Sequence, residues 1–265
     1  MIDLHAHFLY GVDDGPARIE DSFELLRQAE QAGISKILAT PHVTEHTTPR
    51  AEEKIKQVFE EIKNGLAERH LQIEIHLAAE VYYSPKMIGW AEHPWLLIGS
   101  GQPYMLFDLP MQFIPADISE IIFQLIRKKV TPIMAHPERN VEVQKEPHLP
   151  ADWVRLGCLM QMDAGSITGE FGRVCQRTAQ ELIRNGYIHL VASDAHDRIE
   201  RNFHLLANAC TRVKKKHGSH WANLLFNDNP LRILNGEKVI LPTPINPGSN
   251  VNFIQKISGR LKSGN

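Results

Sequence analysis

Histidines and acidic residues in this 265-residue chain occur in short motifs that are typical of metal centres. His5 and His7 are two positions apart, so on an extended strand both imidazoles point to the same side and can bind one cation. Asp194 and His196 have the same spacing near the other end of the chain. A single pair of this kind arises easily by chance. A metal site therefore requires further ligands that the fold brings to the same place.

Short apolar runs alternate with segments of helical periodicity, and this pattern predicts the elements that position the candidate ligands. Strand followed by helix at this spacing indicates parallel strands with helical crossovers. Seven such units favour a closed or nearly closed α/β barrel, with an open doubly wound sheet as the alternative. The predicted strands are 2–4, 36–40, 73–79, 104–107, 131–135, 158–162 and 188–193, and the predicted helices are 19–32, 52–69, 117–129, 173–185, 198–217, 221–226 and 230–234.

Nearly every predicted strand is followed by a residue that can bind metal. The carboxyl ends of parallel barrel strands converge on one mouth, so these residues are expected to become neighbours. Asp14 comes from an acidic Asp13-Asp14-Gly15 turn, and Asp163 follows the sixth strand. The candidate metal ligands are His5, His7, Asp14, His42, Glu80, Asp108, His136, Asp194 and His196.

Nine candidate ligands exceed the needs of one ion, since a tetrahedral zinc takes four. We expect two or three divalent ions that share a bridging carboxylate, and Glu80 is the best bridge because it has two oxygens on a long stem. Imidazoles and carboxylates without thiolate favour manganese, iron or zinc over calcium or a cysteine-bound zinc. Four carboxylates buried together without cations would be very costly, so we expect metal at the mouth if the chain forms this barrel.

Two arginines lie close in sequence to these candidate ligands. Arg139 follows one of them by three residues and Arg201 follows another by five. A planar guanidinium makes paired hydrogen bonds to phosphate or carboxylate oxygens, which suits it to hold an anionic substrate against metal. We therefore expect Arg139 and Arg201 to bind the substrate, with Arg18 and Arg198 as weaker candidates. The nine other histidines are expected at the surface or at caps, with His46 the main exception.

Composition limits the classes of function. The 29 Lys and Arg residues against 31 Asp and Glu give a net charge of -2, which argues against nonspecific nucleic-acid binding. No stretch approaches the run of about 18 apolar residues that a membrane-spanning helix needs. The N-terminus does not resemble a signal peptide and the three cysteines are widely spaced, so we expect a cytoplasmic protein. Residues 1–241 are expected to form one domain, followed by a flexible tail at 242–265.

The ordered motifs resemble those of the polymerase and histidinol phosphatase (PHP) superfamily of metal-dependent phosphoesterases. That resemblance rests on His5-Ala6-His7, Thr40-Pro41-His42, Glu80, His136 and Asp194-Ala195-His196. Within the superfamily the chain looks most like the bacterial tyrosine-protein phosphatases that are encoded with capsule or exopolysaccharide synthesis systems. The motifs behind this closer likeness include Ala135-His136-Pro137-Glu138-Arg139 and the segment 229–236. The likeness extends over residues 1–240.

The resemblance implies a distorted seven-stranded (β/α)7 TIM-like barrel with a metal site at its C-terminal mouth. It also implies two or three metal ions, above all manganese, and hydrolysis of phosphotyrosine on a protein, which we expect to be a bacterial tyrosine kinase. Asp108 departs from the Glu that is usual in this branch, and the shorter side chain predicts that the ligand shell draws inward, admits a water or binds its metal more weakly. Three alternatives remain: a phosphatase for histidinol phosphate or a nucleotide, a noncatalytic kinase-binding regulator, and a nuclease-like phosphodiesterase, which the lack of a basic groove disfavours. The resemblance matches ligand positions to His5, His7, Asp14, His42, Glu80, His136, Asp194 and His196, and phosphate-holding positions to Arg139 and Arg201.

Overall fold

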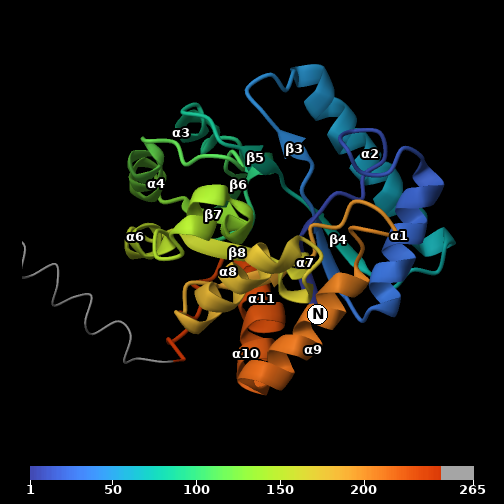
Figure 1. Ribbon diagram of the computed structural model, residues 1–265. Helices are drawn as coiled ribbons and strands as arrows, with labels where there is room; N and C mark the ends of the chain where they lie inside the picture. Colours follow the sequence, from blue (N-terminus) through green and yellow to red (C-terminus); the bar gives the residue numbers. More distant parts are fainter. Residues whose placement is uncertain (246–265) are drawn as a thin grey trace, which may run out of the picture.

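Nine strands form two sheets in residues 1–245, the part of the chain that the computed structural model describes. The sheet orders are β1-β2-β4 and β3-β5-β6-β7-β8-β9, and neighbouring strands are parallel. Helices surround the strands (Figure 1), which confirms the predicted α/β fold. The strands are β1 Ile2–Ala6, β2 Lys36–Ala39, β3 His42–Val43, β4 Glu74–Leu77, β5 Glu80–Tyr82, β6 Tyr104–Asp108, β7 Thr131–Ala135, β8 Leu159–Asp163 and β9 Leu190–Ala192.

Two of the seven predicted strand units are interrupted, which is why the structure has nine strands. The chain leaves regular pairing between β2 and β3, where Pro41 has no N–H to donate, and between β4 and β5. Backbone hydrogen bonds cross these breaks, from Ala78 N–H to the Ala39 carbonyl at 3.0 Å and from Glu80 N–H to the Pro41 carbonyl at 3.1 Å. The two sheets therefore continue into each other along the interrupted strands.

The far ends of the two sheets also meet, at β1 and the residues after β9. His7 N–H donates to the Ala195 carbonyl at 2.8 Å, and Asp194 N–H donates to the His5 carbonyl at 2.9 Å. A parallel bridge joins Ala6 to Ala195. Backbone pairing thus runs from β1 through both sheets and back to β1, which is the arrangement of a distorted barrel.

The helices include the predicted ones, with changes at their ends. Helix α2 begins at Pro49 because the Thr48 side chain accepts a hydrogen bond from the Ala51 N–H and caps it. The predicted helix 198–217 is wrong at its start: residues 198–203 form an irregular loop, and α9 begins at His204. The helices are α1 Ile19–Gln31, α2 Pro49–Glu68, α3 Met87–Trp90, α4 Ile118–Arg127, α5 Val141–Lys145, α6 Pro150–Arg155, α7 Ala164–Thr168, α8 Gly172–Arg184, α9 His204–His217, α10 Ser219–Asn223 and α11 Asn229–Asn235, with 3-10 turns at Pro94–Leu96 and Pro137–Arg139 and a π turn at Leu224–Asp228.

Apolar side chains on the two faces of the strands form two clusters. Because successive strand residues face opposite sides, Leu106 packs in a smaller cluster while Met105 and Phe107 join the larger one. Asp108 lies on the same face as Leu106, so the smaller cluster forms an apolar floor beneath the strand ends that carry the candidate ligands.

Helix α11 packs closely against the loop that precedes β6. Gly236, which ends this helix, has a φ of 70°, and its carbonyl accepts a hydrogen bond from Gln102 N–H at 2.8 Å. The described chain then passes α8, where Ile245 N–H donates to the Arg184 carbonyl at 2.9 Å. Most of the tail expected at 242–265 lies outside the described residues. Within residues 1–245, no helix is long and apolar enough to cross a membrane.

Candidate metal centre

All nine predicted ligands lie together at the carboxyl ends of the strands. Each belongs to at least one group of three or four side chains whose donor atoms lie within 4.8 Å of one another. Two of them, His136 and Asp194, have left-handed backbones, with φ values of 33° and 53°. Such conformations are costly for residues other than glycine and cluster at functional sites. The groups are His7/Asp14/His42/His196, His5/His7/Glu80, His5/His136/Asp194 and Glu80/Asp108/His136.

The nine side chains of these four groups together form what we call the donor cluster. Glu80 lies at its centre. Its Oε2 atom lies 3.2 Å from His5 Nε2, 3.3 Å from His7 Nε2 and 2.9 Å from His42 Nδ1. Its Oε1 atom lies 3.2 Å from His136 Nε2. One buried carboxylate therefore contacts four of the candidate imidazole ligands, which is the placement expected of a bridging ligand.

Asp14 and Asp108 lie at the edges of the donor cluster. The Asp14 side chain is 60% exposed, and its Oδ1 atom is 3.1 Å from His196 Nε2 and 3.3 Å from His42 Nε2. Asp108 Oδ1 is 3.6 Å from His136 Nδ1, so the shorter carboxylate still reaches this group. Burial raises the pKa of Asp108, as does the nearby charge of Glu80, while His136 acts in the opposite direction.

The donor cluster attracts positive charge. Burial disfavours protonation of His7, but hydrogen bonds to Asp13 and Glu80 outweigh it and raise its pKa to about 10. His136 is also buried, and the charge of Asp108 and a hydrogen bond to Glu80 raise its pKa to about 9. Divalent cations would satisfy the same carboxylates without requiring protonated imidazoles.

Two buried ligand atoms have close neighbours but no hydrogen bond of good geometry. Glu80 Oε2 lies near imidazole nitrogens and His196 Nε2 lies near Asp14, yet neither atom makes a well-aligned hydrogen bond among the described residues. Burial, together with the charge of His7, lowers the pKa of His196 to about 4, so its imidazole is neutral near pH 7 and keeps a lone pair for metal. Oxygen and nitrogen donors without sulfur suit manganese, iron or zinc. The residues present therefore fit a centre of divalent ions.

Asp13 and Gln161 orient two of the candidate ligands, and sequence reasoning did not assign them this role. Asp13 Oδ2 lies 2.9 Å from His7 Nδ1, and Gln161 Oε1 lies 2.8 Å from His5 Nδ1. Because both oxygens are acceptors, each imidazole donates through Nδ1, and with a bound cation in place of the second proton each would present its Nε2 lone pair to that cation. The only sequence signals were the acidic turn for Asp13 and the strand-end position for Gln161.

Both predicted substrate-binding arginines converge on Asp194. Arg139 Nη1 donates to Asp194 Oδ2 at 2.9 Å, and Arg201 Nη2 donates to the same oxygen. Burial opposes ionisation of Asp194, but the charges of His5, Arg201 and His136 outweigh this effect and hold its pKa well below the usual value. The two guanidinium groups thus lie beside the donor cluster, where both could bind one anionic substrate.

Arg139 is held in place by residues outside the donor cluster. Its Nη1 atom also donates to Asp163 Oδ2 at 3.3 Å, and its guanidinium lies 4.3 Å from the centre of the Phe171 ring. Asp163 belongs to no donor group among the described residues, and its Oδ1 atom caps α7 by accepting the Gly165 N–H at 2.7 Å. By contrast, Arg18 lies at the surface, where it pairs with Asp21.

Two histidines test the expectations for the remaining nine. His46 is 87% exposed and lies 3.7 Å from Glu45, so the exception expected in the sequence does not join the donor cluster. His189 was expected at the surface or at a cap, but it is buried and its Nδ1 atom accepts the Met160 N–H at 3.1 Å. Burial lowers its pKa to about 4. The surface assignment of His189 is therefore wrong.

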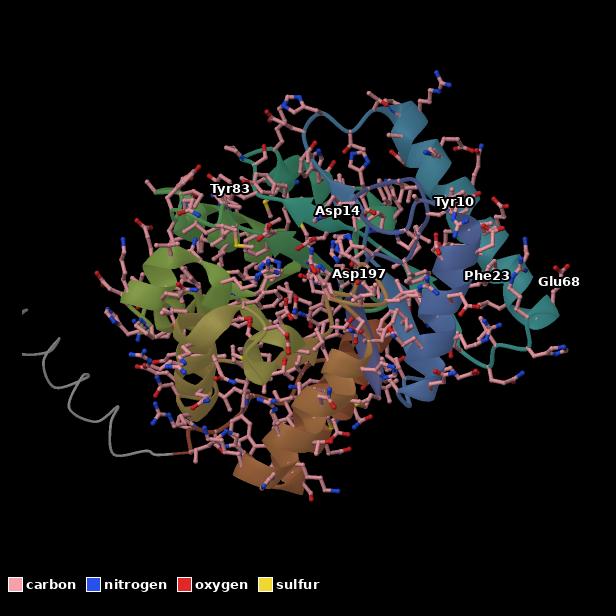
Figure 2. All side chains as sticks on the ribbon, turned by 45° about the vertical axis from the view of Figure 1, so that its right-hand side comes forward. Tyr10, Asp14, Phe23, Glu68, Tyr83 and Asp197 are labelled. Atoms are coloured by element: carbon pink, nitrogen blue, oxygen red, sulfur yellow. The ribbon has the colours of Figure 1, made fainter. Side chains whose placement is uncertain are left out.

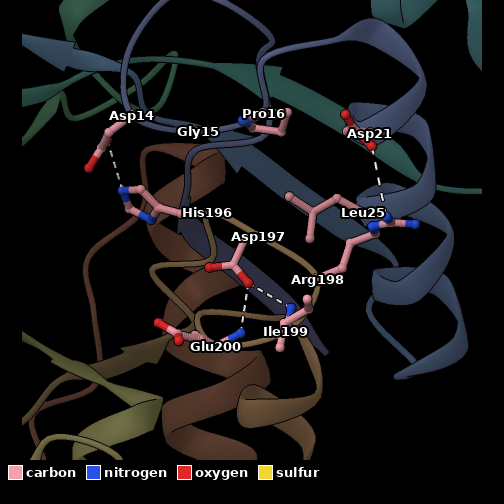
Figure 3. Close-up of a pocket in the computed structure, with 10 residues that line it drawn as sticks. All are labelled: Asp14, Gly15, Pro16, Asp21, Leu25, His196, Asp197, Arg198, Ile199 and Glu200. Atoms are coloured by element: carbon pink, nitrogen blue, oxygen red, sulfur yellow. Dashed lines mark hydrogen bonds and ion pairs between the residues drawn. The ribbon is translucent and has the colours of Figure 1, made fainter.

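A cavity of about 450 Å³ opens beside the donor cluster and shares Asp14 and His196 with it (Figure 3). Figure 2 shows two of its residues, Asp14 and Asp197, near the strand ends. Asp197 shapes one wall of this cavity, because its carboxylate accepts the N–H groups of Ile199 at 2.6 Å, Glu200 at 2.7 Å and Arg201 at 3.2 Å. These bonds form the loop that replaces the start of the predicted helix.

Comparisons with known proteins agree in fold and in family. The family model described as capsular polysaccharide synthesis, CpsB/CapC, matches residues 1–235. The CapC protein of Staphylococcus aureus is 31% identical over 205 residues, which cover 77% of this chain and 80% of that protein. The tyrosine-protein phosphatase YwqE of Bacillus subtilis strain 168 is 29% identical over 235 residues, which cover 89% of this chain and 92% of YwqE.

Solved structures show the same likeness. A crystal structure from the pair YwqE of Bacillus subtilis and CpsB of Streptococcus pneumoniae, described as unique metal-dependent tyrosine phosphatases, matches with a TM-score of 0.83 and 28% identity. The match covers 93% of this chain and 100% of that one. The lactonase Lmo2620 of Listeria monocytogenes matches with a TM-score of 0.52 and 13% identity, which is a likeness of fold alone.

Proposed function

The chain belongs to the CpsB/CapC family of capsular polysaccharide synthesis, and we propose that it hydrolyses phosphotyrosine on a protein in a metal-dependent reaction. The observation that carries this proposal is the donor cluster with two arginines beside it. Support also comes from the close structural match to metal-dependent tyrosine phosphatases.

We assign two or three divalent ions to this site, with manganese foremost and iron or zinc as alternatives. Glu80 would bridge ions, and the remaining ligands would be His5, His7, Asp14, His42, Asp108, His136, Asp194 and His196. Bound ions of this kind polarise phosphoryl oxygens and lower the pKa of coordinated water towards neutrality.

The two arginines would hold the phosphate. Arg139 is already oriented by Asp163 and Phe171, so its guanidinium needs little rearrangement to bind non-bridging oxygens. Arg201 would bind the same phosphate from the loop shaped by Asp197. A tyrosine phenolate, whose conjugate acid has a pKa of about 10, departs without strong protonation, so the reaction depends little on a general acid.

We further propose a bacterial tyrosine kinase of polysaccharide synthesis as the protein substrate, with the reaction in the cytoplasm. The family description, capsular polysaccharide synthesis, supports this assignment. Residues 1–241 would act as one phosphoesterase domain.

The test is metal analysis of the purified protein, together with an assay on a phosphotyrosine peptide after chelation and after addition of manganese, iron or zinc. We expect two or three metal equivalents, no turnover after chelation and recovery with one of the ions. His42→Ala and Asp194→Ala should lose metal and nearly all turnover. Full activity after chelation, or a trapped phosphocysteine, would overturn the proposal. Faster hydrolysis of histidinol phosphate than of the peptide would favour the small-molecule alternative, and an inert, metal-free protein would favour the noncatalytic regulator.

A further inference from the structure

We propose that the cavity beside the donor cluster receives the aromatic ring of the substrate, and that Ile199 selects aryl over alkyl phosphates. This inference rests on the proposed function, because it assumes that the phosphate binds at the donor cluster. It adds a binding site for the leaving group and a residue that determines specificity.

The cavity is placed to receive a group attached to the phosphate. Asp14 and His196 belong both to the donor cluster and to the cavity lining. Figure 3 shows these two side chains at one end of the cavity, with Leu25 and Arg198 towards the other. The volume of about 450 Å³ is within the range of about 300–1,000 Å³ that is usual for small-molecule sites. A leaving group can therefore extend from the metal centre into this space.

Apolar side chains contribute to the cavity lining from separate parts of the chain. Pro16, from the segment after β1, and Leu25, from α1, are buried, and Leu25 is 0% exposed, so they back the inner wall of the cavity. Ile199 contributes from the loop before α9 and is 84% exposed, more than any other large apolar side chain of residues 1–245. A ring in this cavity would cover the Ile199 side chain and remove apolar area from water.

The loop that carries Ile199 is held in one shape, which suits a specificity residue. Asp197 accepts three consecutive N–H groups of this loop, and the Arg201 carbonyl accepts the N–H groups of His196 at 2.7 Å and Asp197 at 3.1 Å. Exposed apolar residues that occur singly need no explanation in general. Ile199 differs because this bonded loop fixes it at the rim of a cavity that opens onto the donor cluster.

The charges around the cavity favour an uncharged ring over a second anion. Four carboxylates contribute to the lining, against one arginine, Arg198. Asp21 pairs with Arg18 and lies 3.9 Å from Arg198, and Asp14 would bind cations. Asp197 and Glu200 are therefore the two lining carboxylates that have neither a proposed metal ion nor an arginine or lysine partner in the described part of the chain. A leaving group with further phosphates would be repelled here. An aromatic ring has a positive edge that can face carboxylates.

The experiment measures inhibition of p-nitrophenyl phosphate hydrolysis by phenylphosphonate and by methylphosphonate, which share the anionic group and differ in the ring. Ile199→Ser should raise the inhibition constant of phenylphosphonate about five- to tenfold, in line with the loss of one apolar contact, and leave that of methylphosphonate unchanged. Ile199→Leu should restore tight binding. Leu241→Ser is the matched control, because Leu241 is 67% exposed and does not line the cavity.

Two results would overturn the inference. An unchanged constant for phenylphosphonate in Ile199→Ser would place the ring elsewhere. An equal rise for both phosphonates would mean that Ile199 only supports the loop that carries Arg201. Failure of the proposed function gives a different result, since the metal-loaded wild type would then not hydrolyse a phosphotyrosine peptide, while phosphonate binding could still be read by calorimetry.

Discussion

Replacing Asp13 with Asn should weaken metal binding without removing any proposed ligand. The Asp13 carboxylate lies 2.9 Å from His7 Nδ1 and keeps the proton on that nitrogen, which leaves the Nε2 lone pair directed at the cluster. An amide either accepts this hydrogen bond more weakly or presents its own N–H to Nδ1. The second arrangement favours the tautomer with a protonated Nε2, which cannot bind metal.

The size of the effect follows from the contacts of Asp13. Its oxygens also accept the N–H groups of Gly15 at 3.1 Å and His42 at 3.3 Å, and an Asn side chain has one oxygen that can keep only part of this set. Loss of such an orienting partner typically costs about 10- to 100-fold in metal affinity, which is about 1.4–2.8 kcal/mol. We expect Asp13→Asn to fall in this range.

The assay is a competition titration of the protein with manganese and a chelator of known affinity. Asp152→Asn is the control, since Asp152 is exposed and pairs with Arg155 away from the donor cluster. A dissociation constant within twofold of wild type, in a variant that unfolds at the wild-type temperature, would refute the assigned role of Asp13.

Three further perturbations have expected outcomes. Asp108→Glu should bind manganese more tightly in equilibrium dialysis, because the longer side chain reaches closer to Glu80 and His136; equal or weaker binding would contradict this. Gly236→Ala should lower the free energy of unfolding in urea by about 3 kcal/mol, since its Cβ would lie 2.3 Å from the Gly101 nitrogen; Gly33→Ala, with φ 78° and free space, should cost only about 1 kcal/mol. Buried His189 has a pKa of about 4, so the folded protein binds fewer protons there than the unfolded chain. The contribution of His189 to the free energy of unfolding should therefore be fully present above about pH 6.5 and fall by about 3 kcal/mol towards pH 4. Urea titrations at several pH values should show a smaller loss for His189→Gln than for the wild type.

Local patterns in the sequence predicted the elements and the candidate ligands for a simple reason. Apolar periodicity reports which face of a helix or strand is buried, and parallel strands place their carboxyl ends at one mouth. Residues as far apart as His5 and His196 could therefore be expected together, and the structure brings them within one donor cluster. The motif His5-Ala6-His7 needed only the geometry of an extended strand.

Side-chain contacts between distant segments decided the rest. Sequence spacing does not distinguish Asp13, which orients His7, from Asp14, which lies at the edge of the cluster, because the direction of each carboxylate depends on how the turn packs. Asp163 follows a strand as the candidate ligands do, yet it contacts Arg139 instead.

The chain by itself determined which residue types stand at the strand ends, since that depends on periodicity along one segment. Tertiary structure decided the broken strands, the loop that carries Ile199 and the cavity beside the metal centre. These features arise from hydrogen bonds and packing between segments that lie far apart in sequence. Local sequence patterns do not predict such contacts.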